Sequence, residues 1–192
     1  MADLTVDYMG LKLRNPLVVG SSGLTDKMET IRNLEQNGAG ALVLKSLFEE
    51  EIVLEKQARL SQMQSGGELY PESLDFYSYE DAPAESTSSY LETIRGAKKQ
   101  VSIPVMASIN CMSAEQWTWF PAEIEKAGAD ALELNLFILP SDMNRTVEES
   151  EKIYFDIIGE VADRIKIPVA LKIPYYFTNL ASMISRLSET GV

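Results

Sequence analysis

EQNGAGAL at Glu35–Leu42 and EKAGADAL at Glu125–Leu132 are two copies of one phrase, and they decide the fold class. In each copy a helix-like segment ends at a glycine suited to a left-handed helix cap, and an apolar, strand-like run follows. A second phrase, IPV, opens apolar runs at Ile103 and at Ile167. This repetition favours a (β/α)8 barrel over a doubly wound sheet, and the sequence holds no GxGxxG loop.

Five short apolar runs are predicted to be buried strands, because they are too short for helices and do not alternate strictly between apolar and polar residues. Helix-like stretches separate most of them, and this alternation predicts a parallel α/β sheet with right-handed crossovers. The predicted strands are Pro16–Gly20, Ala41–Ser46, Pro104–Ile109, Ala131–Phe137 and Pro168–Ile173.

The predicted helices have recognisable starts. We expect Asp26 to cap a helix that ends near Gln36, with Glu29 as its capping-box partner. Further helices are predicted at Trp117–Lys126, with Ser113 and Gln116 as a capping pair, at Thr146–Arg164 and at Thr178–Ser188.

We expect residues 1–192 to form a single partial TIM-barrel domain. The 192 residues hold five predicted strands, where a full barrel of about 250 residues has about eight. The final Glu189–Val192 matches the first half of the helix-to-strand phrase, so we expect the sequence to be part of a longer barrel. Residues 58–86 interrupt the pattern, and such a long connection either covers an active site or is a surface insertion.

Composition excludes several function classes. The 17 Lys and Arg against 29 Asp and Glu give a formal charge of −12, which disfavours nucleic-acid binding. No apolar run approaches the ~18 to 20 residues of a membrane span, and the start lacks a signal peptide, so we expect a cytoplasmic protein without membrane association. With one Cys and no His, the chain has no Cys–His or Ser–His nucleophile pair, and we expect no metal site.

Polar residues stand where the predicted strands end, and the carboxyl ends of barrel strands face the active site. Lys45 and Lys172 both close apolar strands, and a buried ammonium costs several kcal/mol unless an anion or acceptor meets it. Their convergence suggests a bound anionic or electron-accepting group; the alternative is internal ion pairs with Glu49 or Glu133. The residues at these ends are Ser21, Ser22, Lys45, Ser46, Asn110, Asn135 and Lys172.

Five blocks in order resemble the dihydroorotate dehydrogenase family and together cover most of the chain. This resemblance implies an FMN-containing TIM barrel that oxidises dihydroorotate to orotate in pyrimidine synthesis. The blocks are NPLVVGSSG at Asn15–Gly23, ALVLKS at Ala41–Ser46, SINCMSAEQW at Ser108–Trp117, ALELNL at Ala131–Leu136 and ALKIPYYF at Ala170–Phe177.

The resemblance implies roles for the residues at the strand ends. Ser22 would lie beside the flavin, Lys45 and Ser46 would contact the flavin and the substrate side, and Asn135 would lie between flavin and substrate. Lys172 would face the N1 and O2 edge of the flavin, where a fixed cation stabilises the negative charge that hydride transfer leaves. Asn110 is a further expected cofactor contact, and Lys45 and Asn135 are the expected substrate contacts.

The sequence departs from the family in two loops. After Asn135 stands LFILPSD, where the family has a Ser-Cys-Pro-Asn-like loop whose Cys is the catalytic base in cytosolic members. Ser141 is a candidate base in a displaced register, so the catalytic residue stays unassigned. The Gly-Leu-Pro-Asn-like substrate loop after the second strand is replaced by Gly66-Gly67 and Tyr70-Pro71, and Cys111 is expected to be structural. These changes leave the small-molecule substrate open.

Two other functions stay open. A lysine in an apolar barrel strand can form an imine, so Lys172 could serve a Schiff-base lyase. The chain could also be a non-catalytic fragment that associates with a complementary half, because an open parallel sheet exposes an unpaired edge. We expect a homo-oligomer.

Overall fold

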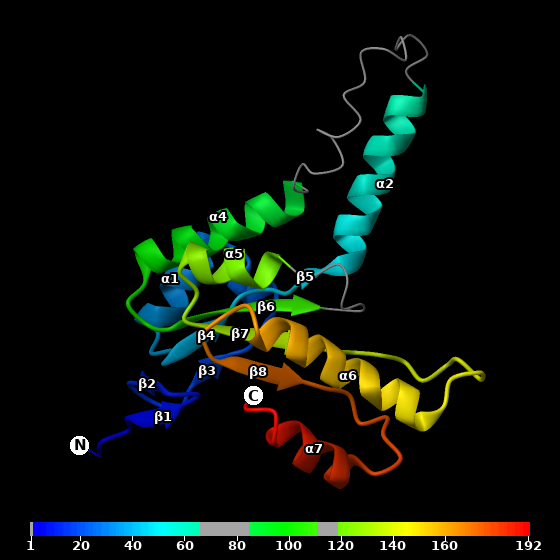
Figure 1. Ribbon diagram of the computed structural model, residues 1–192. Helices are drawn as coiled ribbons and strands as arrows, with labels where there is room; N and C mark the ends of the chain where they lie inside the picture. Colours follow the sequence, from blue (N-terminus) through cyan, green and yellow to red (C-terminus); the bar gives the residue numbers. More distant parts are fainter. Residues whose placement is uncertain (1, 66–84, 111–118) are drawn as a thin grey trace.

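The computed structural model describes residues 2–65, 85–110 and 119–192, and its elements follow a β/α order (Figure 1). The strands are β1 (Val6–Tyr8), β2 (Leu11–Leu13), β3 (Val18–Val19), β4 (Ala41–Val43), β5 (Leu47–Phe48), β6 (Val105–Asn110), β7 (Ala131–Asn135) and β8 (Val169–Lys172). The helices are the 3-10 turn η1 (Gly23–Thr25), α1 (Met28–Gln36), α2 (Glu49–Ser65), α4 (Glu85–Gln100), α5 (Phe120–Ala127), α6 (Val147–Ala162) and α7 (Leu180–Ser188).

The main sheet of the described residues is parallel, with strand order β3-β4-β6-β7-β8, and β5 pairs with β6 beyond the end of β4. Neighbouring strands are also neighbours along the chain, as a barrel requires, whereas a doubly wound sheet reverses direction at a switch point. The five parallel strand positions therefore form half of a barrel, which confirms the predicted fold class of an incomplete (β/α)8 barrel.

All five predicted strand runs contain strands, but one predicted helix cap is wrong. Asp26 does not cap α1, which begins at Met28 after Lys27 without a side-chain cap. Ser22 and Thr25 instead form a capping box on η1, just upstream. Asn179 caps α7, which lies within the predicted helix Thr178–Ser188. The capping pair predicted at Ser113 and Gln116 lies outside the described residues.

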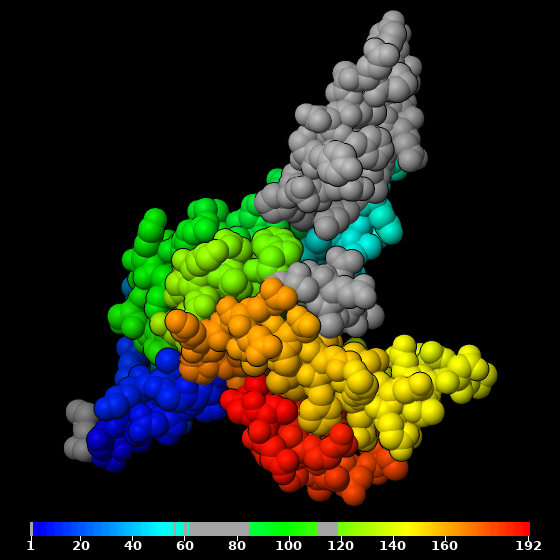
Figure 2. All heavy atoms as spheres, viewed as in Figure 1, coloured from blue at the N-terminus to red at the C-terminus, as the bar shows by residue number. Residues whose placement is uncertain are grey.

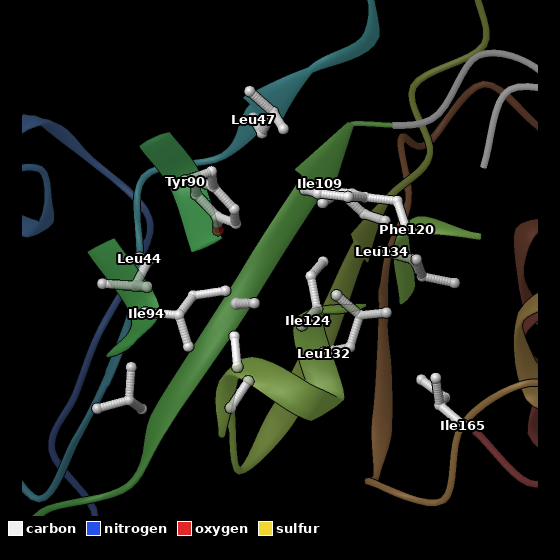
Figure 3. Packing of buried hydrophobic residues seen from close by; sticks show 14 of the residues in the cluster. Leu44, Leu47, Tyr90, Ile94, Ile109, Phe120, Ile124, Leu132, Leu134 and Ile165 are labelled. Atoms are coloured by element: carbon white, nitrogen blue, oxygen red, sulfur yellow. The ribbon is translucent and has the colours of Figure 1, made fainter. Parts of the chain in front are cut away.

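The helix-facing side of the sheet carries the larger apolar core. Alternate strand residues such as Ile109, Leu132 and Leu134 are fully buried there, against Ile94 of α4 and Ile124 of α5 (Figure 3). Since successive strand residues point to opposite faces, the residues between them line the barrel interior. The helices therefore fix which polar side chains face inward.

The antiparallel hairpin of β1 and β2, which the sequence analysis did not predict, covers the amino-terminal end of the interior. Leu13 packs there with Ala41, Val43, Met106 and Ala131, the inward residues at the starts of β4, β6 and β7. In Figure 1 the hairpin lies away from the arrowheads of β6 and β8. The amino-terminal end of the interior is thus apolar, and the polar inward side chains of the described strands lie toward the carboxyl end.

Residues 58–86, predicted as an insertion, are described only in part. α2 extends through Ser65 and projects away from the sheet, and α4 begins at Glu85 (Figure 1). The remainder of the predicted insertion, with Gly66-Gly67 and Tyr70-Pro71, lies outside the described residues. Among the helices that are described, none is long and apolar enough to cross a membrane.

Candidate functional site

The strand position formed by β4 and β5 carries one extra residue at the carboxyl end of the sheet. Val43 pairs with Met106 and Leu47 with Ile109, so this strand advances four residues while β6 advances three. Such a bulge opens the hydrogen-bond ladder and re-aims a side chain, and bulges are common beside active sites. Here the bulge holds Lys45 and Ser46, two of the predicted site residues.

Tyr90 of α4 closes the gap that the bulge leaves in the ladder. Its buried hydroxyl accepts a hydrogen bond from the amide N–H of Ser108 (2.8 Å) and donates one to the carbonyl O of Ser108 (2.9 Å). Burial raises the pKa of Tyr90, so the hydroxyl stays protonated and keeps both roles. The distortion at Lys45 and Ser46 is therefore stabilised by the surrounding structure.

A chain of polar side chains crosses the strand positions at this level, and we call it the polar chain. Ser46 Oγ lies 3.0 Å from Ser21 Oγ and 2.7 Å from Ser108 Oγ. Ser108 Oγ donates to Glu133 Oε1 (2.7 Å), and Lys172 Nζ lies 3.8 Å from the same oxygen. The side chain of Glu133 is 17% exposed and that of Lys172 is 52% exposed, so the ion pair is loose at the lysine end.

Two residues further along β6 and β7 than Ser108 and Glu133, three predicted site residues form a row across β6, β7 and β8. Asn110 pairs with Asn135, and Asn135 with Lys172, so all three side chains share one face. Asn110 is buried, and its Oδ1 finds no hydrogen-bond partner among the described residues. A buried acceptor without a donor costs about 1 to 3 kcal/mol, and such a group in a native fold calls for an explanation, such as a ligand.

The other predicted residues are placed differently. Lys45 is the re-aimed residue of the bulge, and its Nζ lies 3.6 Å from Asp26, outside the row of Asn110, Asn135 and Lys172. Ser22 is exposed and accepts from the N–H of Leu24 at the start of η1 (3.3 Å). The structure therefore joins Ser46 and Lys172 in the polar chain and pairs the two lysines with different carboxylates.

The ion-pair alternative for the lysines is met in part. Lys172 does pair with Glu133, as that alternative anticipated, whereas Lys45 pairs with Asp26 and not with Glu49. Ser141 is exposed in a turn, where its N–H donates to the carbonyl O of Leu139 (2.8 Å). Cys111 lies outside the described residues.

Sequence reasoning missed Ser108 and named Glu133 only as an ion-pair partner, although these two residues are the central members of the polar chain. Each stands two residues before a predicted site residue, Asn110 and Asn135, on the same strand and therefore on the same face. That period of two is the signal that would have found them. In the part of the chain that the structure describes, no group of three or more Cys, Asp or Glu side chains could hold a metal ion.

Solved structures with a similar fold include a dihydrodipicolinate synthase from Bacillus anthracis and a phosphonopyruvate hydrolase. The first has 13% sequence identity and a TM-score of 0.56, and the match covers 90% of this chain and 51% of that one. The second has 17% identity and a TM-score of 0.55, covering 93% and 56%. At these identities the likeness shows the fold alone.

Curated relatives include the catalytic subunits of dihydroorotate dehydrogenase B (NAD(+)) from Thermoplasma volcanium and Thermoplasma acidophilum. The first is 25% identical over 189 residues, which cover 94% of this chain and 57% of the relative. The second is 28% identical over 181 residues, covering 90% and 55%. The chain thus spans little more than half the length of these relatives. The family model described as dihydroorotate dehydrogenase matches residues 3–189, so the chain belongs to the dihydroorotate dehydrogenase family.

Proposed function

We propose that this chain contributes flavin-binding residues to an FMN-dependent oxidoreductase, which acts on a CH–CH bond of a small-molecule substrate. Family membership supports this proposal, and the relatives' names make dihydroorotate the first substrate to test. Because the chain spans 57% and 55% of those two relatives, the activity of a whole protein is part of the proposal.

The observation that carries the proposal is the Oδ1 of Asn110, which has no hydrogen-bond partner in the described part of the chain and lies in the same row as Lys172. An isoalloxazine ring offers one N–H donor and two carbonyl acceptors along its pyrimidine edge. Asn110 would accept from such a donor, and Lys172 would donate to such an acceptor. The residues present therefore fit the cofactor.

Bound FMN would supply the acceptor for a hydride. Lys172 has a half-exposed ammonium, and its cation would stabilise the negative charge that develops on the reduced ring. Glu133, which accepts a hydrogen bond from Ser108, lies 3.8 Å from Lys172 and would help to orient its ammonium. Ser22, Lys45 and Ser46 stay predicted cofactor contacts, and Lys45 and Asn135 stay predicted substrate contacts.

The first experiment is a titration of the chain with FMN, followed by flavin fluorescence. Lys172→Met should weaken FMN binding by about tenfold, the size of one charge-assisted hydrogen bond. Lys152→Met is the matched control, since Lys152 is an exposed lysine of α6 that pairs with Asp156. The control should bind FMN as the native chain does. Absence of saturable FMN binding, or equal affinity in Lys172→Met, would overturn the proposal.

Two additional measurements separate substrate from cofactor. Dihydroorotate added without oxygen should bleach the visible absorbance of bound FMN if dihydroorotate is the substrate. Borohydride with pyruvate should leave the mass of the chain unchanged. A mass increase that disappears in Lys172→Met would instead support the Schiff-base lyase.

A further inference from the structure

Glu133 is an acidic side chain that faces the interior, one level nearer the amino-terminal end than the row of Asn110, Asn135 and Lys172. It pairs in the sheet register with Ala170, two residues before Lys172. Its side chain is only 17% exposed. A carboxylate is seldom buried to this extent unless other groups stabilise its charge. The neighbours of Glu133 therefore decide what this charge can do.

Three serine hydroxyls support this carboxylate, and their hydrogens all point the same way. Ser108 Oγ donates its single hydrogen to Glu133 Oε1 (2.7 Å), so it accepts in its 2.7 Å contact with Ser46 Oγ. Since the hydrogen of Ser46 is used in that contact, Ser21 donates to Ser46 (3.0 Å). Hydrogen bonds aligned in this way strengthen one another. The serines therefore fix both the position and the charge of Glu133.

Lys172 is fixed at its backbone and loose at its ammonium. Its carbonyl O accepts from the N–H of Leu136 (2.9 Å). Val169 and Leu171 of β8 pack into the core with residues of α6 and α7, which lie side by side in Figure 2, so Lys172 faces the interior. Its side chain is 52% exposed, and its Nζ lies 3.8 Å from Glu133 Oε1. The ammonium can therefore leave Glu133 without any change in the backbone.

We propose that Glu133 is a fixed counter-ion that limits how strongly Lys172 binds an electron-rich ligand in the candidate site. Because Ser108 holds Glu133 and the ammonium is loose, a ligand that contacts Lys172 must share the ammonium with Glu133 or draw it away. Glu133 is thus a positioning residue, since it acts through Lys172. The inference deepens the proposed function, on which its cofactor part rests, and FMN is the first ligand to test.

The two charges of this pair act in opposite directions on the two oxidation states of the cofactor. The reduced flavin ring carries more negative charge than the oxidised ring at the edge assigned to Lys172. A nearby carboxylate opposes that charge, and an ammonium stabilises it. Removal of the carboxylate should therefore favour the reduced form, whereas removal of the ammonium should favour the oxidised form. A mere loss of packing would weaken the binding of both forms alike.

The first test needs no cofactor and measures the reactivity of the Lys172 amine. The native chain and Glu133→Gln are treated with limiting acetic anhydride, and the labelled peptides are quantified by mass spectrometry. Acetylation destroys the ammonium and with it the ion pair, so the pair slows the reaction. Glu133→Gln should label Lys172 about twofold to fivefold faster, the range of a partly exposed ion pair. Lys152 is the internal reference, because it is an exposed lysine that pairs with Asp156 on α6.

Two control variants separate charge from local structure. Glu123→Gln makes the same change in a glutamate of α5 that pairs with Lys126, and it should leave the labelling of Lys172 unchanged. Ser108→Ala removes a hydrogen bond to Glu133 and keeps the carboxylate, so it should not speed the labelling. An equal increase in Ser108→Ala and Glu133→Gln would indicate local loosening and overturn the inference. An unchanged rate in Glu133→Gln would overturn it as well.

The second test titrates oxidised and dithionite-reduced FMN into the chain without oxygen, followed by isothermal titration calorimetry. Glu133→Gln should raise the ratio of reduced to oxidised affinity by about twofold to fivefold, and Lys172→Met should lower it. Shifts of the same sign in both variants would overturn the inference. Faster labelling of Lys172 in Glu133→Gln, without FMN binding by the native chain, would remove the proposed function and leave the counter-ion standing. FMN binding with unchanged labelling would do the reverse.

Discussion

The two copies of the helix-to-strand phrase fold alike, and the difference between them that the structure explains is at their sixth position. Gly38 and Gly128 both have positive φ, of 99° and 98°, and end α1 and α5. Two residues after this glycine, the first copy has Gly40 and the second has Asp130. We call each copy, with its helix end and strand start, a joint: Glu35–Leu42 is the first and Glu125–Leu132 is the second. Their surroundings explain the difference, because the first joint packs against the amino-terminal segment of the chain and the second packs against α4 and β6.

The shared part of the two joints is a backbone clamp. Glu35 Oε1 accepts from the N–H groups of Ser102 (2.8 Å) and Ile103 (3.2 Å). Glu125 Oε1 accepts from Lys166 (3.0 Å) and Ile167 (3.2 Å) in the same way. Each glutamate therefore links the end of a helix to an IPV segment: Glu35 links α1 to the start of β6, and Glu125 links α5 to the start of β8. The amino-terminal end of the sheet is built for stability, whereas the polar chain and the row occupy the other end.

Gly40→Ala should break the first joint and have the largest effect. A Cβ at Gly40 would lie 2.3 Å from the carbonyl O of Asn15, and backbone has no room to yield. We expect a loss of about 3 kcal/mol in the free energy of unfolding, measured by urea denaturation. Gly159→Ala is the control, since a Cβ at Gly159 of α6 meets nothing within 4 Å. It should raise stability by about 0.5 to 1 kcal/mol, and equal effects would show that joint packing is unimportant.

Asp130→Ala should break the second joint by a different route. Asp130 accepts from Lys98 Nζ and, through Oδ2, from the N–H of Val105 (2.7 Å). Loss of both should cost about 1.5 to 2 kcal/mol, because it removes a charge-assisted bond to a strand amide. Lys98→Met removes only the partly exposed ion pair and should cost about 0.5 kcal/mol. A larger loss in Lys98→Met than in Asp130→Ala would contradict this assignment.

Glu35→Gln should weaken the clamp by about 1 kcal/mol near neutral pH, since one neutral oxygen replaces a charged one. The hydroxyl of Ser102 donates to Glu35, and this bond, with the backbone bonds from Ser102 and Ile103, holds the pKa of Glu35 below its ordinary value of 4.5. A carboxyl with a lowered folded pKa stabilises the fold above its unfolded pKa, and this contribution is lost as the pH falls through the folded pKa.

The pH profile therefore checks the clamp. The stability difference between the native chain and Glu35→Gln should be constant above about pH 6 and shrink below about pH 4.5. Urea midpoints between neutral and acid pH measure it. A difference that stays constant into acid would show that Glu35 acts through its shape and not through its charge.

The sequence was sufficient for the repeated joints and for the strand order, because left-handed glycines and short apolar runs are local signals. It was insufficient where tertiary contacts decide. The bulge at Lys45 and Ser46 depends on Tyr90, which lies in a helix 44 residues further along the chain than Ser46. The start of α1 was misjudged because Ser22 and Thr25 formed their own turn upstream of Asp26.

In the candidate site, too, the positions set by strand ends were predictable, and the position set by the bulge was not. That Asn110, Asn135 and Lys172 form one row was predictable, because each ends a strand and the parallel register brings strand ends together. Lys45 also ends an apolar run, but the extra residue of the bulge turns it toward Asp26. Side-chain direction at a bulge depends on pairing with another strand, which a linear pattern does not contain.

Lys172→Met should have the smallest effect on stability and so sharpens the contrast between the two ends of the sheet. Its ammonium is half exposed and lies 3.8 Å from Glu133, and pairs of this kind contribute about 0 to 1 kcal/mol. We expect its unfolding free energy to stay within about 0.5 kcal/mol of the native value in urea denaturation. Glu133→Gln should cost more, because Glu133 also accepts from the buried Ser108 (2.7 Å). If Lys172→Met were as destabilising as Gly40→Ala, Lys172 would be a structural residue, and loss of FMN binding in that variant would no longer support a cofactor contact.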